Sequence, residues 1–266
     1  MDQQIRHEFK AAWAFVERNF NLSRRYLGWE AVFLTYTVVN AVTIALIGIG
    51  QGQKRVFYLV IGALFWEFLG VLFHDISEAI AWERWEGTIE YTFMAPIHRL
   101  THLLGSCMFA ILYAMARVIL ILLIMMFFFR FDLAGANLPG AFVVLVFAGL
   151  SFVGMGLAAA VLPMLSTEKG AQATHIFQAV ILLVSGVYYE TSVLPAWIRP
   201  LSFLSPGTYA LRAARRTLLE GAGLGAIIPE LIVLLLTGIF LIPAGFAVFK
   251  WGERYAMKTG RLKRSG

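Results

Sequence analysis

The sequence predicts an all-α polytopic membrane protein with six transmembrane helices. Hydrophobic residues make up 59% of its 266 positions and charged residues only 14%, with a mean hydropathy of +0.74. A soluble domain usually carries about a quarter charged residues, so this composition argues against a soluble globule. The apolar runs are long and continuous, which favours helical spans over the roughly ten-residue alternating strands of a membrane barrel.

Six apolar runs approach or exceed the ~20 residues needed to cross about 30 Å of hydrocarbon. They are Ala31–Ile49, Val56–His74, Leu103–Phe129, Pro139–Leu165, His175–Leu194 and Ala226–Phe249. The C-terminal half of the fifth run enters a proline-rich stretch, so its end is the hardest to place. We treat residues 1–266 as one transmembrane domain.

The distribution of basic residues predicts the orientation of the chain. An even number of spans places both termini on one side, and loops rich in Lys and Arg face the cytoplasm. The segments 1–30 and 250–266 hold half of the 22 Lys and Arg residues. We therefore expect a multi-pass protein of a bacterial or archaeal cytoplasmic (inner) membrane with both termini inside. No signal peptide is recognisable in residues 1–30, and the single cysteine allows no intrachain disulfide.

Three arginines, Arg212, Arg215 and Arg216, fall on the opposite side and depart from this rule. Two interpretations remain open. The segment 195–221 is a re-entrant or interfacial structure against the outer leaflet, or one of the spans is misassigned. Prolines that break the chain just before the arginines favour the first interpretation.

Two further segments flank the first two spans. Residues 1–30 carry an apolar stripe, which predicts an amphipathic interfacial helix on the inner membrane surface: Ile5, Phe9, Trp13, Val16 and Phe20. A helix packed on a protein partner would show the same stripe. The loop 75–101 connects residues 31–74, which hold spans one and two, to residues 103–194, which hold spans three to five. It is rich in Glu, with Gly87 interrupting a helical pattern and Pro96 ending it. It is either a docking surface for another protein or a solvated loop helix.

These segments resemble a known family. WERWEGTIEYTFMAPIHR, from Trp82 to Arg99, is similar to the cytoplasmic loop of permease subunits of type-2 ATP-binding-cassette (ABC) exporters. SGVYYETSVLPAWIRPLSFLSPGTYALRAAR, from Ser185 to Arg215, resembles their second characteristic region. The six-span layout also matches. Trp85 and the paired Arg215 and Arg216 are mild departures from the family pattern.

The resemblance implies a permease domain that works as a homodimer with two cytoplasmic ABC ATPase subunits. Residues of the loop would form the coupling helix that contacts the ATPase: Glu83, Arg84, Glu86, Gly87, Thr88, Glu90 and Pro96. The re-entrant outer helices between spans five and six would form an outer gate with Leu194, Pro195, Pro206 and Tyr209. The domain would end with span 226–249 and a basic cytoplasmic tail.

The residues also predict that this chain is no enzyme and binds no cofactor. No Lys is preceded by Gly, so a phosphate-binding loop of the G-x-x-x-x-G-K-[ST] type is absent from the sequence. If transport is driven by ATP, the partner ATPase must bind ATP and Mg²⁺. His98 and His102 have a spacing that suits a metal, but no third ligand accompanies them, so we expect no metal site.

Two polar and aromatic stripes mark candidate transport-path residues. On the first span the stripe comprises Trp29, Phe33, Tyr36, Asn40 and Thr43, and on the fifth it includes Gln178, Ser185 and Tyr189. Polar side chains confined to one face indicate a face turned from lipid, either lining a pathway or dimer seam or bonding helix to helix.

Glu67 and Arg117 are the charged residues deep inside spans. Each costs roughly 2.5–3.5 kcal/mol at a helix centre, so we expect them to pair with each other, with a substrate or proton role as the alternative.

The leading hypothesis is the membrane subunit of an ATP-driven exporter for an amphipathic drug-like molecule or lipid. An exporter of a polysaccharide or lipid-linked glycan is the alternative within the family, because the aromatic stripe also suits sugar rings. A secondary transporter or channel without an ATPase is the alternative from another class.

Overall fold

The computed structural model describes residues 2–87, 89–94, 97–166 and 170–259, and every regular element among them is helical. The longer helices are α1 (Asp2–Arg25), α2 (Leu27–Ile47), α3 (Gln53–Glu86), α5 (Arg99–Phe129), α6 (Leu138–Ala159), α8 (Gly170–Ser185), α10 (Pro206–Leu219) and α11 (Ile228–Lys258). Short helices connect them: η1 (Ile49–Gln51), α4 (Ile89–Met94), α7 (Val161–Leu165), η2 (Thr191–Val193), α9 (Arg199–Leu204) and η3 (Leu224–Ile227).

Five helical stretches of the described residues are long and apolar enough to cross a membrane. They are Leu27–Gln51, Gln53–Ser77, Leu100–Phe129, Leu138–Leu165 and Leu224–Lys258. Each contains or closely overlaps one of the predicted spans. The all-helical, multi-span architecture is therefore as the sequence predicts.

The fifth predicted span differs from the structure. Within His175–Leu194 the helix α8 ends at Ser185, and Gly186 then adopts a left-handed backbone conformation with φ 67°. Sixteen residues rise about 24 Å, which is shorter than the ~30 Å hydrocarbon core. The apolar run continues past Ser185, but glycine allows the chain to turn there, and periodicity alone does not show that turn.

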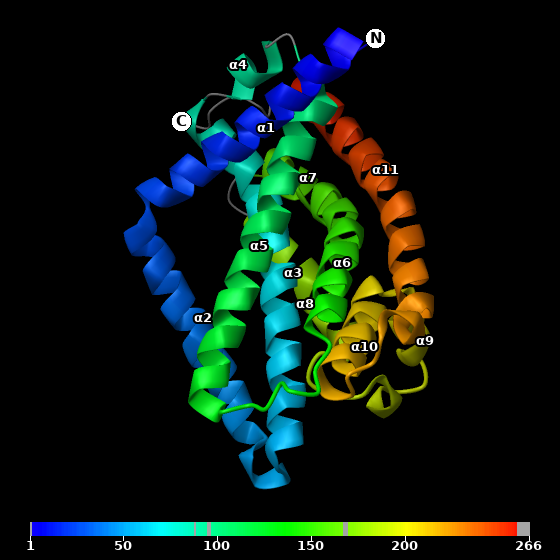
Figure 1. The fold of residues 1–266 in the computed structure, drawn as a ribbon. Helices are drawn as coiled ribbons and strands as arrows, with labels where there is room; N and C mark the ends of the chain where they lie inside the picture. The colour runs from blue at the N-terminus through cyan, green and yellow to red at the C-terminus, as the bar shows by residue number, and fades with distance from the viewer. Residues whose placement is uncertain (1, 88, 95–96, 167–169, 260–266) are drawn as a thin grey trace.

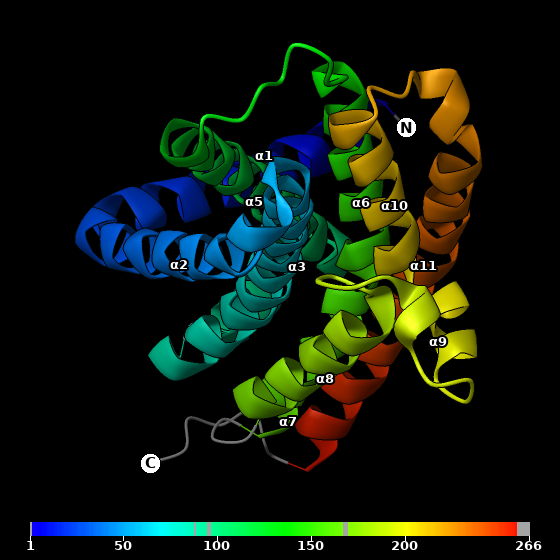
Figure 2. The same cartoon turned by 90° about the horizontal axis from the view of Figure 1, so that it is seen from below.

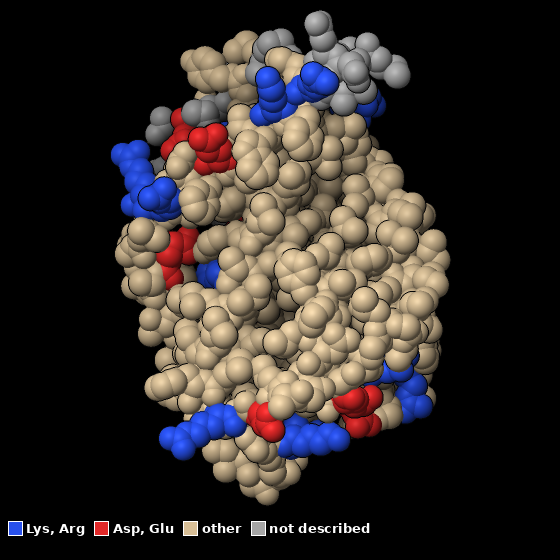
Figure 3. Space-filling model, viewed as in Figure 1, with Lys and Arg blue, Asp and Glu red and all other residues tan. Residues whose placement is uncertain are grey.

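The two ends of the bundle hold different parts of the chain. In Figure 1, α1, α4 and the end of α11 lie at one end, whereas α9, α10 and the start of α11 lie at the other. Figure 3 shows charged side chains gathered toward both ends, with a broad uncharged band between them that is interrupted on one side by a small acidic and basic group. This distribution is that of a membrane-spanning bundle with two polar ends.

Helix α3 is the centre of the bundle. It packs against α2, α5, α6, α8 and α10, and its Phe68, Leu72 and Phe73 are fully buried. Helices α2 and α11 lie on opposite sides of it and leave most of their surface exposed (Figure 2). Because α3 continues to Glu86, the segment from Asp75 onward is a helical extension of the second span and not a separate loop. Gly87, with φ 74°, follows its end, where the sequence predicted an interruption.

Glycines bring α6 and α11 into close contact, as expected for the glycine-rich fourth span. A Cβ at Gly154 would overlap the backbone of Leu241, and one at Gly245 would overlap the carbonyl of Gly154. No larger residue fits these two positions unless the helices move apart.

Helix α1 lies across α5 (Figure 1) and falls within the segment 1–30, where the sequence predicts an amphipathic helix. Ala12 and Val16 are buried, and Gly105 of α5 approaches the carbonyl of Ala12. Phe9 and Trp13 remain exposed. The helix thus buries a face of small side chains on protein and leaves large apolar side chains uncovered, which suits a membrane interface.

Candidate transport and coupling sites

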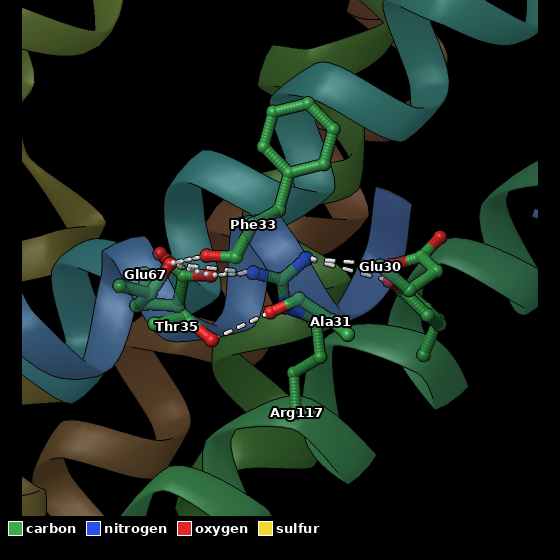
Figure 4. A network of polar contacts seen from close by, with 8 residues as sticks. Glu30, Ala31, Phe33, Thr35, Glu67 and Arg117 are labelled. Carbon is green, nitrogen blue, oxygen red and sulfur yellow. Dashed lines mark hydrogen bonds and ion pairs between the residues drawn. The ribbon is translucent and has the colours of Figure 1, made fainter. Parts of the chain in front are cut away.

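A network of three charged side chains joins α2, α3 and α5 inside the bundle. Arg117 Nη2 lies 2.8 Å from Glu67 Oε1, and Arg117 Nη1 lies 3.8 Å from Glu30 Oε2. Thr37 donates a hydrogen bond to Glu67, and the Tyr113 hydroxyl donates one to Glu30. Figure 4 shows the guanidinium of Arg117 between the two carboxylates. The ion pair expected between Glu67 and Arg117 is present, and it is part of a larger network.

Helical spacing explains how the network assembles. Tyr113 and Arg117 are four residues apart on α5, and Glu30 and Thr37 are seven apart on α2, so each pair shares one helix face. Glu30, Thr37 and Tyr113 were not predicted from the sequence as members of this network. The one available signal was a carboxylate at the start of an apolar run, on the same face as a threonine two turns later.

A first cavity of about 470 Å³ opens between α1, α2, α3 and α5. Its aromatic lining comes from Tyr26, Trp29, Phe33, Trp82 and Phe109. Its acidic lining comes from Glu30, Asp75, Glu83 and Glu86, and among the described residues Arg18 gives the lining a fixed positive charge. Two predicted path residues, Trp29 and Phe33, and two predicted coupling residues, Glu83 and Glu86, therefore border one cavity.

A second cavity of about 250 Å³ lies deeper, between α2, α3 and α5. The predicted residues Tyr36, Asn40 and Glu67 line it, together with Trp66 and Tyr188. Tyr188 comes from the turn after α8, so the structure brings the first and fifth predicted spans together here. Because Glu30 lines the first cavity and Glu67 the second, Arg117 joins carboxylates that border different cavities.

The stripe on the first predicted span lies mostly on the surface of the chain. Trp29 is 65% exposed and Tyr36 69% exposed, and Asn40 and Thr43 are exposed as well. A single chain therefore does not enclose this stripe.

The stripe on α8 is divided between burial and surface. Gln178 is buried near Gly70 of α3, and Ser185 is buried with its hydroxyl 2.7 Å from that of Ser205. The Tyr189 hydroxyl donates to the Leu183 carbonyl at 2.5 Å. Ser185 thus bonds the end of α8 to the start of α10, which is a packing role.

Glu83 connects three helices at the end of the bundle that holds α1. Its Oε1 lies 2.8 Å from Arg18 Nη1 of α1 and 3.2 Å from His102 Nε2 of α5, and its side chain is 3% exposed. Burial raises the pKa of Glu83, but the hydrogen bonds and charges of His102 and Arg18 outweigh burial and leave this pKa below its usual range.

The segment before α11 folds back on the bundle at the opposite end. Arg215 donates hydrogen bonds to the carbonyls of Gly186 and Val187 at 3.1 and 2.6 Å, and its guanidinium lies 3.6 Å from the centre of the Tyr58 ring. Arg216 pairs with Glu230 at 2.9 Å. Two of the three arginines that depart from the charge rule are therefore bound within the protein. Among the predicted gate residues, Leu194 and Pro206 are buried, Tyr209 is half-buried and Pro195 is exposed.

The family model of the ABC-2 type transporter matches residues 10–219, from within α1 to the end of α10. The chain belongs to the ABC-2 type transporter family. As a member it is a membrane transport subunit of an ABC transporter, with several helices in the membrane, and not an enzyme. The resemblance of the two sequence segments to this family is confirmed.

Relatives of this ABC-2 chain include the "Probable multidrug ABC transporter permease YbhR" of Escherichia coli strain K12 and its namesake in Escherichia coli O157:H7. Each is 25% identical over 175 residues, which is 65% of this chain and 47% of the relative. The match thus spans about half the length of these curated relatives.

The residues expected to couple an ABC-2 subunit to its ATPase are only partly described. Glu83 is buried, Glu86 is exposed, and Gly87 follows the end of α3. Thr88 and Pro96 lie outside the described residues, as do the side chains of Arg84 and Glu90. Arg18 was not predicted as a site residue, and His102 was considered only as a metal ligand. Their contacts with Glu83 were not predicted, because they lie 65 and 19 residues from it in the chain.

Proposed function

We propose that the chain is the permease subunit of an ATP-driven exporter that moves an amphipathic drug-like molecule or lipid outward. Two copies would pair and each would bind one ABC ATPase subunit, which would hold ATP and Mg²⁺. The family membership supports the transporter, and the multidrug designation of the relatives supports drug-like cargo over a glycan.

The contact of Glu83 with two other helices is the observation that carries the coupling proposal. Glu83 lies near the end of α3, four residues before Gly87, and binds α1 through Arg18 and α5 through His102. An ATPase that pushed on this end of α3 would move α1 and α5 with it, because the charge-assisted contacts and the helix packing join all three.

The orientation belongs to the same proposal. The end of the bundle that holds α1, α4 and the end of α11 would face the cytoplasm, where the ATPase is. Helix α8 would be the fifth of six crossings, completed by the turn after Ser185, and α9 and α10 would form the re-entrant outer gate. Irregular backbone at membrane depth must be covered by protein, and the bonds from Arg215 to the carbonyls after α8 meet that requirement.

The exposed stripe on α2 would meet the second copy or line a path between copies. Trp29, Phe33 and Tyr36 are large and exposed, and a partner that covered them would remove this apolar surface from lipid. A cysteine at Tyr36 would crosslink two copies if the stripe is a seam. The native Cys107 is buried and would not compete for the crosslinker.

Reconstitution with the ATPase tests the proposal. The permease and an ABC ATPase encoded beside it should copurify, and vesicles holding both should accumulate a fluorescent drug-like cargo only with ATP. Glu86→Lys and Gly87→Pro should abolish cargo-stimulated ATP hydrolysis. Glu220→Lys, a matched charge reversal after α10 at the other end of the bundle, should leave it unchanged.

Three outcomes would contradict parts of this assignment. Transport without any ATPase would favour a secondary transporter or channel. ATP-dependent transport of a lipid-linked glycan and not of drug-like molecules would favour the glycan alternative. If no ATPase copurifies with the permease and no ATP-dependent transport is found, the exporter assignment is refuted.

A further inference from the structure

The cavity between α1, α2, α3 and α5 combines a size and a position that suit a small amphipathic ligand. Its volume of about 470 Å³ lies within the roughly 300–1,000 Å³ of typical ligand pockets. Its lining residues on α2 and α3 lie at the ends of the apolar stretches Leu27–Gln51 and Gln53–Ser77. A ligand would therefore reach it from the border between hydrocarbon and water.

The aromatic side chains give the cavity walls that favour a cation. Trp29 and Phe33 lie one turn apart on α2 with ring centres 6.4 Å apart, and Trp82 and Phe109 come from α3 and α5. Aromatic faces attract organic cations through the negative potential above the ring, and they also cover the apolar body of such a ligand.

The charges of the lining act in the same direction. Among the described residues, the lining holds four carboxylates, one guanidinium and the imidazole of His74, and Arg18 is already engaged by Glu83. Arg117 is nearer to Glu67 than to Glu30, at 2.8 against 3.8 Å, so its charge offsets Glu67 more than Glu30. Asp75 and Glu86 add further negative charge to the same wall. The lining attracts a cation and repels an anion of the same shape.

We propose that this cavity binds an organic cation with an aromatic or other apolar body, taken up where the bundle meets the inner membrane surface. This inference rests on the proposed transport function for its purpose, but binding itself requires neither ATP nor the ATPase.

Two ions of nearly equal size and opposite charge provide the test. Binding of tetraphenylphosphonium and of tetraphenylborate is measured in separate samples of the purified permease in maltoside detergent, with protein-free micelles subtracted. The non-ionic detergent avoids competition from lipid headgroups. We expect saturable binding of the phosphonium and none of the borate.

Variants locate the binding site. Trp29→Ala and Asp75→Asn should each weaken phosphonium binding by about fivefold or more, the range that one cation–aromatic or charge contact supplies. Trp29→Phe, which keeps an aromatic face, should retain most of the affinity, and this rescue separates a binding role from misfolding. Trp251→Ala on α11 and Asp132→Asn in the loop after α5 are matched controls, because both residues are outside the cavity lining.

Equal binding of both ions would overturn the proposal, and so would phosphonium binding that neither Trp29→Ala nor Asp75→Asn weakens. These outcomes are separate from those of the exporter test. Phosphonium binding without ATP-dependent transport would support the binding site and refute the exporter. ATP-dependent transport without phosphonium binding would support the exporter and refute the binding site.

Discussion

Arg117 Nη2 of α5 lies 2.8 Å from Glu67 Oε1 of α3, within the apolar part of both helices. A charge in this position is tolerated because an opposite charge lies against it. Glu30 of α2 pairs with the same guanidinium, so the single positive charge of Arg117 links α2, α3 and α5.

Removal of Arg117 alone should therefore destabilise the bundle more than removal of the pair. Arg117→Met leaves two carboxylates without their cation, and we expect a loss of about 3 kcal/mol, whereas Arg117→Met with Glu67→Gln should recover part of it. Thermal unfolding in detergent measures both. Arg25→Met, at the exposed end of α1, is the control. A double variant no more stable than the single one would argue against a pair.

Arg215 should not tolerate Lys. Its guanidinium donates to the Gly186 and Val187 carbonyls and lies over the Tyr58 ring, and an ammonium cannot make this set of contacts. We expect Arg215→Lys to lower the free energy of unfolding by about 1–2 kcal/mol. Arg212→Lys, at an exposed position one turn earlier on the same helix, should change it little. Equal effects at both positions would show that Arg215 does not hold the turn after α8.

The contact of Glu83 with His102 and Arg18 should give stability that depends on pH. The pKa of Glu83 is lowered in the fold, so its contribution is fully present above the ordinary carboxyl pKa of about 4.3 and is lost as pH falls through the lowered pKa. Thermal unfolding between pH 6 and pH 3 should therefore show a smaller acid-induced loss in Glu83→Gln than in the parent protein. Glu17→Gln, exposed on α1, should follow the parent curve. Parallel curves for all three would refute this prediction.

Position 245, where α11 contacts α6, should not tolerate any residue larger than glycine. A Cβ there overlaps the Gly154 carbonyl, so Gly245→Ala must push α6 and α11 apart, and we expect a cost of about 1–3 kcal/mol. Gly225→Ala, where an added Cβ meets nothing within 4 Å, is the matched control. Thermal unfolding in detergent measures the stability of both variants. If Gly245→Ala does not lower the stability, the two helices do not approach this closely.

Much of the fold was predictable from local composition. The apolar runs at residues 31–49, 56–74, 103–129, 139–165 and 226–249 all lie in membrane-length helical stretches, because a continuous apolar run of this length satisfies its backbone in lipid only as a helix. The fifth run was predicted too long. Its hydropathy continues past Ser185, but the turn at Gly186 depends on contacts with Arg215, which is 29 residues away.

The candidate sites were predictable only where a residue type is costly by itself. Glu67 and Arg117 were recognisable because a charge within an apolar run needs a partner. Glu30 and Tyr113 were missed, because a carboxylate at a span end and a tyrosine within a span are ordinary until a neighbouring helix brings Arg117 to them.

The sequence by itself determined the class of protein, the approximate spans and the family resemblance, since these depend on hydropathy and on short segments read in order. The tertiary structure alone decided which charges meet, where α8 ends and which helices enclose the two cavities. Those features depend on distances between segments far apart in the chain, and helix packing sets these distances whereas local composition does not.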